Sequence, residues 1–514
     1  MSQTLSLLPL SFWVVIALLI GGAVWAVWHF RDGSGLPMLL VLGTVAAWYV
    51  GDVLYNDYPN YHVELFEQDV LRGAWWQVTW FVIVFLVATP WMHRWLNARY
   101  LGKSSGVLLL FKYGVRQPVF QKQLNLLFVG CASIWLFLIL IAAFRTQGRI
   151  LYFLFPFLGE GPDPWGRGRI GSGFDAIWTA AFYFQLLVTG IFGVVAALAT
   201  NRRIRMWALI FCLFAMPYFI LQRARNIMLA AVIPGVLSWI FLRLRGRMWK
   251  RFVVLIVCFL LVNAWMGFVI ANRSEMSITE AIKQKGLALS ADEGVHHEGL
   301  NMYEELCWIN TFIEDGSYKP NWGSRYFAEL VNPIPRALWP GKPLIGIDYA
   351  IARGQAGGGA EGAGVYATIS TGMIGQGVVN FGRILGPAFA ALLMSLWVTI
   401  LARLDLRISE LGRLPLYFCG LILTFNLGRD ITLITLYPFV FGYLALWMAD
   451  QWGSRQMRVA TRTQVRQKPR AGFNQRRTFP QPLQRPNATS TLIVKATAKK
   501  IPPSNVRAPS RNHF

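Results

Sequence analysis

Two cationic side chains lie on a proline-rich stretch over residues 332–343, which reads Asn-Pro-Ile-Pro-Arg-Ala-Leu-Trp-Pro-Gly-Lys-Pro. Each proline fixes φ and removes a backbone donor, so this segment can be neither a helix interior nor a central strand. A stiff, extended segment can present Arg336 and Lys342 to an anionic ligand. Guanidinium and ammonium groups bind phosphate oxygens. The stretch therefore predicts recognition of a phosphate or diphosphate.

Three more arginines lie in short polar turns between apolar runs. Arg223 and Arg225 occur in Leu-Gln-Arg-Ala-Arg-Asn, and Arg429 precedes Asp430 in Asn-Leu-Gly-Arg-Asp. Any one of these arginines alone could simply extend its charge toward a lipid headgroup. Taken together with Arg336, they favour diphosphate binding, because the guanidinium fork matches phosphate oxygens in a bidentate way.

Transfer of a group onto a hydroxyl also needs a base that accepts the hydroxyl proton. The densest ionisable cluster is Ala-Asp-Glu-Gly-Val-His-His-Glu, which contains His296 and His297, and a solvated loop crest is its alternative interpretation. Adjacent histidines point apart and no His-x-x-x-His spacing is present, so we expect no metal site. Glu361, in a glycine-rich strip, is a rival base. An earlier acidic group is better interpreted as a solvated amphipathic helix: Asp52, Asp57, Glu64, Glu67 and Asp69.

The composition predicts a membrane protein, so membrane-spanning helices must position these side chains. Of the 514 residues, 55% are hydrophobic and only 14% are charged, which is too apolar for a soluble chain of this length. A helical span needs roughly 20 apolar residues. We therefore predict an all-α polytopic membrane protein with about eleven transmembrane helices, within a range of 10–12. The predicted spans are about residues 11–30, 36–55, 74–92, 124–144, 176–199, 206–221, 227–242, 252–271, 384–402, 414–427 and 431–449.

The distribution of charge predicts the topology. Short basic connectors at residues 93–122, 202–205 and 243–251 are expected in the cytoplasm by the positive-inside rule. Residues 451–514 contain fourteen Lys or Arg and no Asp or Glu, and account for more than half of the net charge of +24. We expect residues 1–449 to form the membrane domain and residues 450–514 a disordered cytoplasmic tail that contacts anionic lipid, not nucleic acid.

One long outer loop is expected over residues 272–365. It contains twelve acidic residues and eight Lys or Arg, so it is net negative, as suits a translocated loop. A further full span directly after it would place the basic tail outside. We therefore predict a re-entrant or interfacial element over residues 366–380, whose glycines, threonines and Gln376 suit a cavity lining better than a lipid-facing surface.

Several of these features together resemble the O-antigen polymerase, or oligosaccharide repeat unit polymerase, family. They are the proline-rich loop with Arg336 and Lys342, the Val-Val-Asn-Phe-Gly stretch that ends at Gly382, and the Arg-x-Arg-Asn turn. The resemblance covers roughly residues 215–445. The family often has an acidic residue before its Asn-Phe-Gly stretch, where this chain has Gln376.

The resemblance implies glycosyl transfer at the outer face of the cytoplasmic (inner) membrane, from a glycan on polyprenyl diphosphate to a lipid-linked repeat unit. The diphosphate site would comprise Arg223, Arg225, Arg336, Lys342 and Arg429, and the catalytic candidates are Arg336, Glu361 and His296. No cofactor is expected, and membrane lipids, a chain-length regulator and a flippase are candidate partners. The alternatives are an O-antigen ligase, with His296 or His297 as base, and a membrane transporter.

Overall fold

In the computed structural model of this chain, most of the described residues are helical, and there is no strand among them. The chain divides into two compact units, Met1–Gln451 and Trp452–Phe514, and almost all of the second unit, including the predicted basic tail, lies outside the described part. The described residues are 8–55, 58, 62–155, 163–165, 175–220, 225–244, 248–271, 301–332, 334–335, 338–343, 347–354, 369–432 and 436–452.

Six of the described helices are long and apolar enough to cross a membrane, so the helical membrane architecture agrees with the composition. The predicted number of about eleven is not confirmed. The other five predicted spans also coincide with helical residues, but two of these helices, Ile227–Arg243 and Arg413–Leu427, are shorter. The six are Leu10–Asp32, Gly35–Leu54, Gln68–Leu96, Phe120–Arg145, Ala180–Leu198 and Gly372–Asp405.

The elements of the N-terminal half begin where the sequence provides helix-starting residues. Pro118 occupies the first turn of α8, where its missing N–H costs no hydrogen bond, and the Ser105 hydroxyl caps α7 by accepting from the backbone N–H of Leu108 at 3.3 Å. The elements are α2 (Leu10–Trp28), η1 (His29–Asp32), α3 (Gly35–Val45), η2 (Ala46–Val50), α4 (Gly51–Tyr55), α5 (His62–Leu65), α6 (Gln68–Leu96), η3 (Ala98–Tyr100), α7 (Gly106–Tyr113), α8 (Pro118–Arg145) and α9 (Ile150–Leu154).

The second half includes the longest described helix, α19, and helices inside the predicted outer loop. The elements are α10 (Asp175–Leu198), α11 (Arg202–Ile220), α12 (Arg225–Ser238), η5 (Trp239–Arg243), α13 (Met248–Ala271), α15 (Met302–Glu314), α16 (Ser324–Val331), α17 (Ile347–Ala352), α19 (Gly372–Asp405), α20 (Arg413–Leu427) and a helix over residues 436–452.

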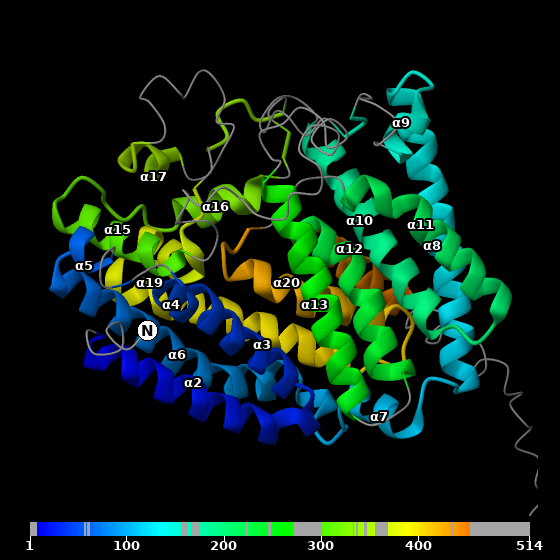
Figure 1. The fold of residues 1–514 in the computed structure, drawn as a ribbon, viewed down its shortest axis with the longest axis horizontal. Coiled ribbons are helices and arrows are strands. Elements are labelled where there is room, and N and C mark those ends of the chain that lie inside the picture. Colours follow the sequence, from blue (N-terminus) through cyan, green and yellow to red (C-terminus); the bar gives the residue numbers. More distant parts are fainter. Residues whose placement is uncertain are drawn as a thin grey trace, which may run out of the picture. The chain divides into compact units, whose positions relative to one another are not determined.

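Helices α2, α3, α6 and α19 run side by side, and they position the site (Figure 1). Polar contacts fix the register of α6 against α19: the Thr89 hydroxyl donates to the Ser395 hydroxyl at 3.0 Å, and the Asn97 amide donates to the Thr399 carbonyl at 3.0 Å. These buried hydrogen bonds cannot be exchanged for water, so they hold α19 in one position along α6.

Helix α19 reverses direction at Gly382. This residue has φ 78° and ψ −178°, a conformation that is essentially restricted to glycine. A Cβ on Gly377 would lie 2.2 Å from the Gly386 carbonyl oxygen, although nine residues of straight helix would separate the two by roughly 13 Å. Residues 372–381 therefore fold back against residues 383–405. The sequence predicts a separate element over 366–380, and its depth in a membrane stays a prediction.

The predicted outer loop is partly helical, which its acidic composition did not indicate. Helix α15 buries Tyr303, Leu306 and Ile309, and it packs along the start of α6. Tyr303 donates to the Leu71 carbonyl at 3.0 Å and stacks on Trp75. The apolar residues of α15 recur at helical spacing, so burial against α6 explains a helix in this region. Arg383 links the far end of α15 to the reversal through an ion pair with Glu314 at 2.8 Å.

Candidate functional site

Helix α16 contributes a buried arginine to the site. Arg325 is 3% exposed, and its Nη2 lies 3.6 Å from Oδ1 of Asp430 and 3.4 Å from the Ile369 carbonyl oxygen. Its Nε and Nη1 have no hydrogen-bond partner within the described part of the chain. A buried donor without a partner is costly. Arg325 therefore has unused capacity to bind an anion.

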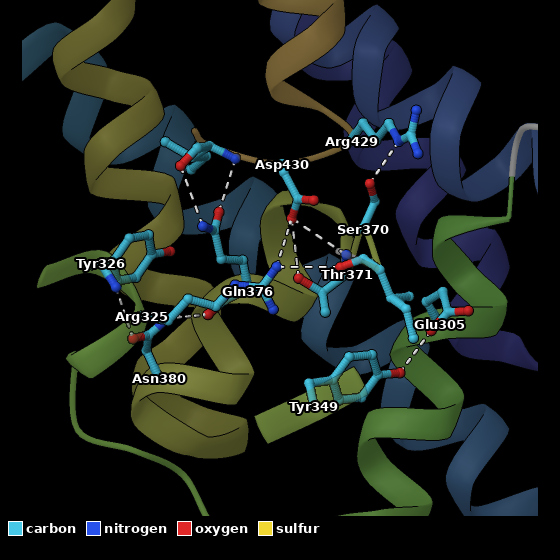
Figure 2. A network of polar contacts seen from close by, with 12 residues as sticks. Glu305, Arg325, Tyr326, Tyr349, Ser370, Thr371, Gln376, Asn380, Arg429 and Asp430 are labelled. Carbon is cyan, nitrogen blue, oxygen red and sulfur yellow. Dashed lines mark hydrogen bonds and ion pairs between the residues drawn. The ribbon is translucent and has the colours of Figure 1, made fainter. Parts of the chain in front are cut away.

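Asp430 is held between the end of α20 and the segment before α19. Its Oδ1 accepts from the backbone N–H of Thr371 at 3.3 Å and from the Thr371 hydroxyl at 3.1 Å, in addition to the contact with Arg325 (Figure 2). All three contacts use Oδ1. The side chain is 12% exposed, so the carboxylate is buried in a polar setting that still reaches the surface.

Burial raises the pKa of the Asp430 carboxyl, because removing water disfavours the charged form. The guanidinium of Arg325, the backbone N–H of Thr371 and the hydroxyl of Ser370 oppose this shift without cancelling it. A carboxylate with a raised pKa accepts a proton more readily than an exposed aspartate. These properties suit a general base.

Arg429 places a second cation next to this carboxylate. It is exposed, and its Nε donates to the Ser370 hydroxyl at 2.6 Å. Figure 2 shows its terminal nitrogens pointing away from Asp430 and the rest of the network. A guanidinium that is fixed at Nε and open at its outer edge can receive two oxygens of a phosphate group. We call Arg325, Ser370, Thr371, Arg429 and Asp430 the Arg325–Asp430 cluster.

The first turns of α19 connect this cluster to the chain around it. The Gln376 amide donates to the Ile431 carbonyl at 3.2 Å, and its Oε1 accepts from the Ile431 N–H at 2.8 Å. Asn380 accepts from the backbone N–H of Tyr326 at 3.4 Å and donates to the Gln376 carbonyl at 2.7 Å. Both amide side chains are fully buried, so they fix α16 and residue 431 relative to α19.

A second buried group of charges involves α4, α15 and α17. Asp52, which is fully buried, accepts from the backbone N–H of Glu304 at 2.8 Å. Glu305 accepts from the Tyr349 hydroxyl at 2.7 Å, and Arg353 lies 3.5 Å from both glutamates (Figure 2 shows Glu305 and Tyr349). Burial raises the pKa of Glu305, although Tyr349 and Arg353 oppose the shift. These contacts join the three helices to one another, so we interpret this group as structural.

The interpretation of the early acidic residues as a solvated helix is wrong for Asp52, which is 0% exposed and faces the Nε2 of His62 at 3.5 Å. It agrees with the exposure of Glu64, Glu67 and Asp69. Asp57 lies outside the described residues. The difference arises because α15 packs over α4 and covers Asp52, a contact between residues about 250 positions apart.

Most of the predicted site residues cannot be placed. Arg223, Arg336, His296, His297 and Glu361 lie outside the described residues. Arg225 begins α12, but its side chain is also outside them. The predicted convergence of these residues with Arg429 therefore stays a prediction.

Lys342 is placed, and it binds the backbone of its own segment. It is 7% exposed, and its ammonium donates to the carbonyl oxygens of Asn332 and Ile334 at 2.9 Å each. Each of these carbonyls precedes a proline. Lys342 thus closes the proline-rich segment on itself, and its role in diphosphate binding stays a prediction.

The sequence motifs do not predict two central residues of the cluster. Asp430 stands in the sequence as the neighbour of Arg429, and Arg325 belongs to none of the motifs described above. A signal for Arg325 existed: in Ser-Arg-Tyr-Phe-Ala-Glu-Leu-Val, Arg325 and Glu329 are four residues apart, which places both on one face of a short helix, away from Phe327 and Leu330.

Comparison with protein-family models, curated proteins and solved structures finds no match to this chain. The case for a function therefore depends on the chemistry of the cluster and on the motifs in the sequence.

Proposed function

We propose that this protein is a membrane glycosyltransferase that polymerises lipid-linked oligosaccharide repeat units, taking the growing glycan from polyprenyl diphosphate at the outer face of the cytoplasmic membrane. One observation carries the proposal: a buried carboxylate, Asp430, lies between a buried arginine with unused donors, Arg325, and an exposed arginine, Arg429. Such a transfer requires a base and cations that bind a diphosphate.

The chemistry can be assigned to these side chains. Asp430 accepts the proton of the acceptor hydroxyl as the hydroxyl oxygen forms a bond to the anomeric carbon. The bond from that carbon to the diphosphate oxygen breaks, and its electron pair stays on the diphosphate. Arg429, with its exposed guanidinium, binds this leaving group, and Arg325 stabilises the charge that develops nearby. The donor carries its own leaving group, so the reaction needs neither a nucleotide nor a cofactor.

The proposed orientation follows the positive-inside rule. Residues 93–122, 202–205 and 243–251 would face the cytoplasm, as would the C-terminal tail, and α15, α16 and α17 would lie outside. The segment over residues 372–381, folded back against residues 383–405, would be the re-entrant element of an eleven-span protein. Its buried Gln376 and Asn380 would then line the floor of the site.

The glycan produced by cells tests this proposal. In a strain that lacks the gene, a polymerase leaves surface glycan one repeat unit long. Polymer that accumulates on its lipid carrier would instead indicate a ligase, and single repeat units trapped on the cytoplasmic side would indicate a transporter.

Complementation then tests the cluster itself. We expect Arg429→Ala to abolish chain extension and Arg429→Lys to restore it only in part, since an ammonium lacks the bidentate fork. Arg72→Ala is the matched control, because Arg72 is also exposed and pairs with exposed Asp69. Full polymer length in Arg429→Ala, at wild-type protein levels, would remove Arg429 from the mechanism.

A further inference from the structure

Helix α16 has its polar and apolar faces reversed relative to a helix on a water-exposed surface. Its charged residues Arg325 and Glu329 are 3% and 4% exposed, whereas Phe327 is 50% and Leu330 66% exposed. In water the apolar face would be buried and the charged face solvated. This reversal indicates that the medium outside α16 is apolar.

The proline-rich segment extends this apolar surface. The ring of Trp339 contacts that of Phe327 edge to face, with 6.4 Å between the centroids. Lys342 holds the segment in place by donating to the carbonyls of Asn332 and Ile334. We call Phe327, Leu330 and Trp339 the apolar face of α16. Leu338, which is 73% exposed, adjoins Trp339 in the same segment.

Helix α16 also contacts α19. Tyr326 contacts the rings of Phe381 and Phe389, which flank the reversal at Gly382 and the start of the membrane-length segment. Between those two phenylalanines, Ile384 is 75% and Leu385 58% exposed. In a candidate membrane span, such residues face lipid. The exposed apolar residues of α19 thus lie in the sequence between two residues that contact α16.

We propose that α16 is an interfacial helix that lies in the membrane surface, with Phe327, Leu330 and Trp339 among the acyl chains of the lipid bilayer and with Arg325 and Glu329 on the side facing the protein. This placement sets Arg325 and Asp430 at the depth of the lipid headgroups. It depends only on exposure and contacts, and it does not require the glycosyl transfer proposed above.

A lipid surface fits these observations better than a protein partner does. A large exposed apolar patch can mark either kind of interface. Here α16 packs against a helix that is itself long and apolar enough to span a membrane, and aromatic residues such as Trp339 are enriched where protein meets the membrane interface.

The test uses the full chain in bilayers of phosphatidylethanolamine and phosphatidylglycerol. Nitroxide labels are attached at Phe327→Cys or Leu330→Cys, in a parent that carries Cys258→Ser because the other four cysteines are buried. The measurement is the accessibility of each label to oxygen, which partitions into lipid, and to a water-soluble nickel chelate. Leu385→Cys serves as the lipid-facing reference and exposed Asp315→Cys as the water-facing reference.

We expect the ratio of oxygen to nickel accessibility at both α16 positions to match the ratio at residue 385. A ratio equal to that at residue 315 would place α16 in water and overturn the proposal. Exclusion of both reagents would also overturn it, because a protein partner or a second copy of the chain would then cover the face. At least half of each native side chain is exposed, so replacement removes little packing beyond the contact of Phe327 with Trp339, and co-elution with the parent on size exclusion verifies folding.

Discussion

Two clusters of charge in this protein contain similar residues but differ in how completely their charges are paired. In the Arg407–Asp450 cluster, formed by Arg407, Glu410, Arg413 and Asp450, Arg413 donates to both oxygens of Asp450 at 2.7 and 2.8 Å, and Arg407 bonds Glu410 and Asp450. In the Arg325–Asp430 cluster, the guanidinium lies 3.6 Å from the carboxylate, and two of its nitrogens have no partner among the described residues.

This difference separates a structural role from a functional one. The Arg407–Asp450 cluster contains two cations and two anions in close, partly bidentate contact, so its hydrogen-bonding capacity is directed within the protein. It joins the start of α20 to the helix over residues 436–452. The Arg325–Asp430 cluster keeps capacity for a ligand. Perturbed carboxylates beside unsatisfied cations are typical of functional sites.

Neutralising one aspartate in each cluster should give the largest contrast. Asp430→Asn keeps the shape and an acceptor for Thr371 but cannot take up the proton of the acceptor hydroxyl. We expect chain extension to fall by about 10²–10⁴-fold, the usual contribution of a general base. The measurement is polymer formation by purified protein in lipid vesicles supplied with lipid-linked repeat units.

Asp450→Asn is the matched control and should retain activity, because Asp450 belongs to the fully paired cluster. Equal loss of activity in both variants would show that loss of structure, and not of the base, explains the effect. Wild-type activity in Asp430→Asn would exclude Asp430 as the proton acceptor.

The sequence predicts the membrane class and the exposed Arg429, because apolar composition and short polar turns are local properties. The pairing of Arg325 with Asp430 is not local, since 105 positions separate the two residues and only the folded chain brings them together. The same is true of Asp52 and Glu304. Charge alone could not show which carboxylate would be buried.

Lys342 shows why local pattern can also mislead. Its position on a rigid loop suggested a cation offered to a ligand. The same prolines that stiffen the loop remove backbone donors, so the carbonyls of Asn332 and Ile334 accept from the lysine instead. A proline-rich segment can present a lysine to a ligand, but its own carbonyl oxygens can also accept hydrogen bonds from that lysine. The turn that the segment adopts decides which of the two occurs.

The reversal of α19 positions one cluster and not the other, so crowding it should affect them unequally. Gly377→Ala places a Cβ 2.2 Å from the Gly386 carbonyl oxygen, and the two segments must separate. We expect a loss of stability of about 1–3 kcal/mol, typical of overpacking, together with reduced activity, because Gln376 lies next to the substituted residue and bonds Ile431. Thermal unfolding in detergent and polymer formation measure the two effects.

Gly130→Ala, in α8, is the control for Gly377→Ala. A Cβ at Gly130 meets no atom within 4 Å, so this change should be neutral or stabilise the helix by up to about 1 kcal/mol. If both alanine variants behave alike, the close approach of Gly377 and Gly386 does not constrain the fold.

Removing a cation from the paired cluster should affect stability alone, and only modestly. Arg413 is 5% exposed but its partner Asp450 is 36% exposed, so solvent screens the pair. We expect Arg413→Ala to cost about 1 kcal/mol and to leave polymer length unchanged. A double-mutant cycle with Asp450→Ala should give a coupling energy of the same order, and a coupling of zero would show that the ion pair contributes nothing.

The smallest expected effect is in the pH dependence of stability, where Asp430 should oppose the usual behaviour of paired aspartates. Burial raises its pKa in the folded protein above the value of about 3.9 for an unfolded chain. A raised pKa means that the folded state binds the proton more tightly, so the contribution of Asp430 to stability is fully present below about pH 3.9 and is lost as pH rises through the raised value.

The variant Asp430→Asn lacks this titration. Relative to wild type, the variant should therefore gain stability as pH rises across that window. Thermal unfolding of the two proteins at matched pH values measures the difference, and a relative loss of stability by Asp430→Asn with rising pH would show that Arg325 and Thr371 outweigh burial.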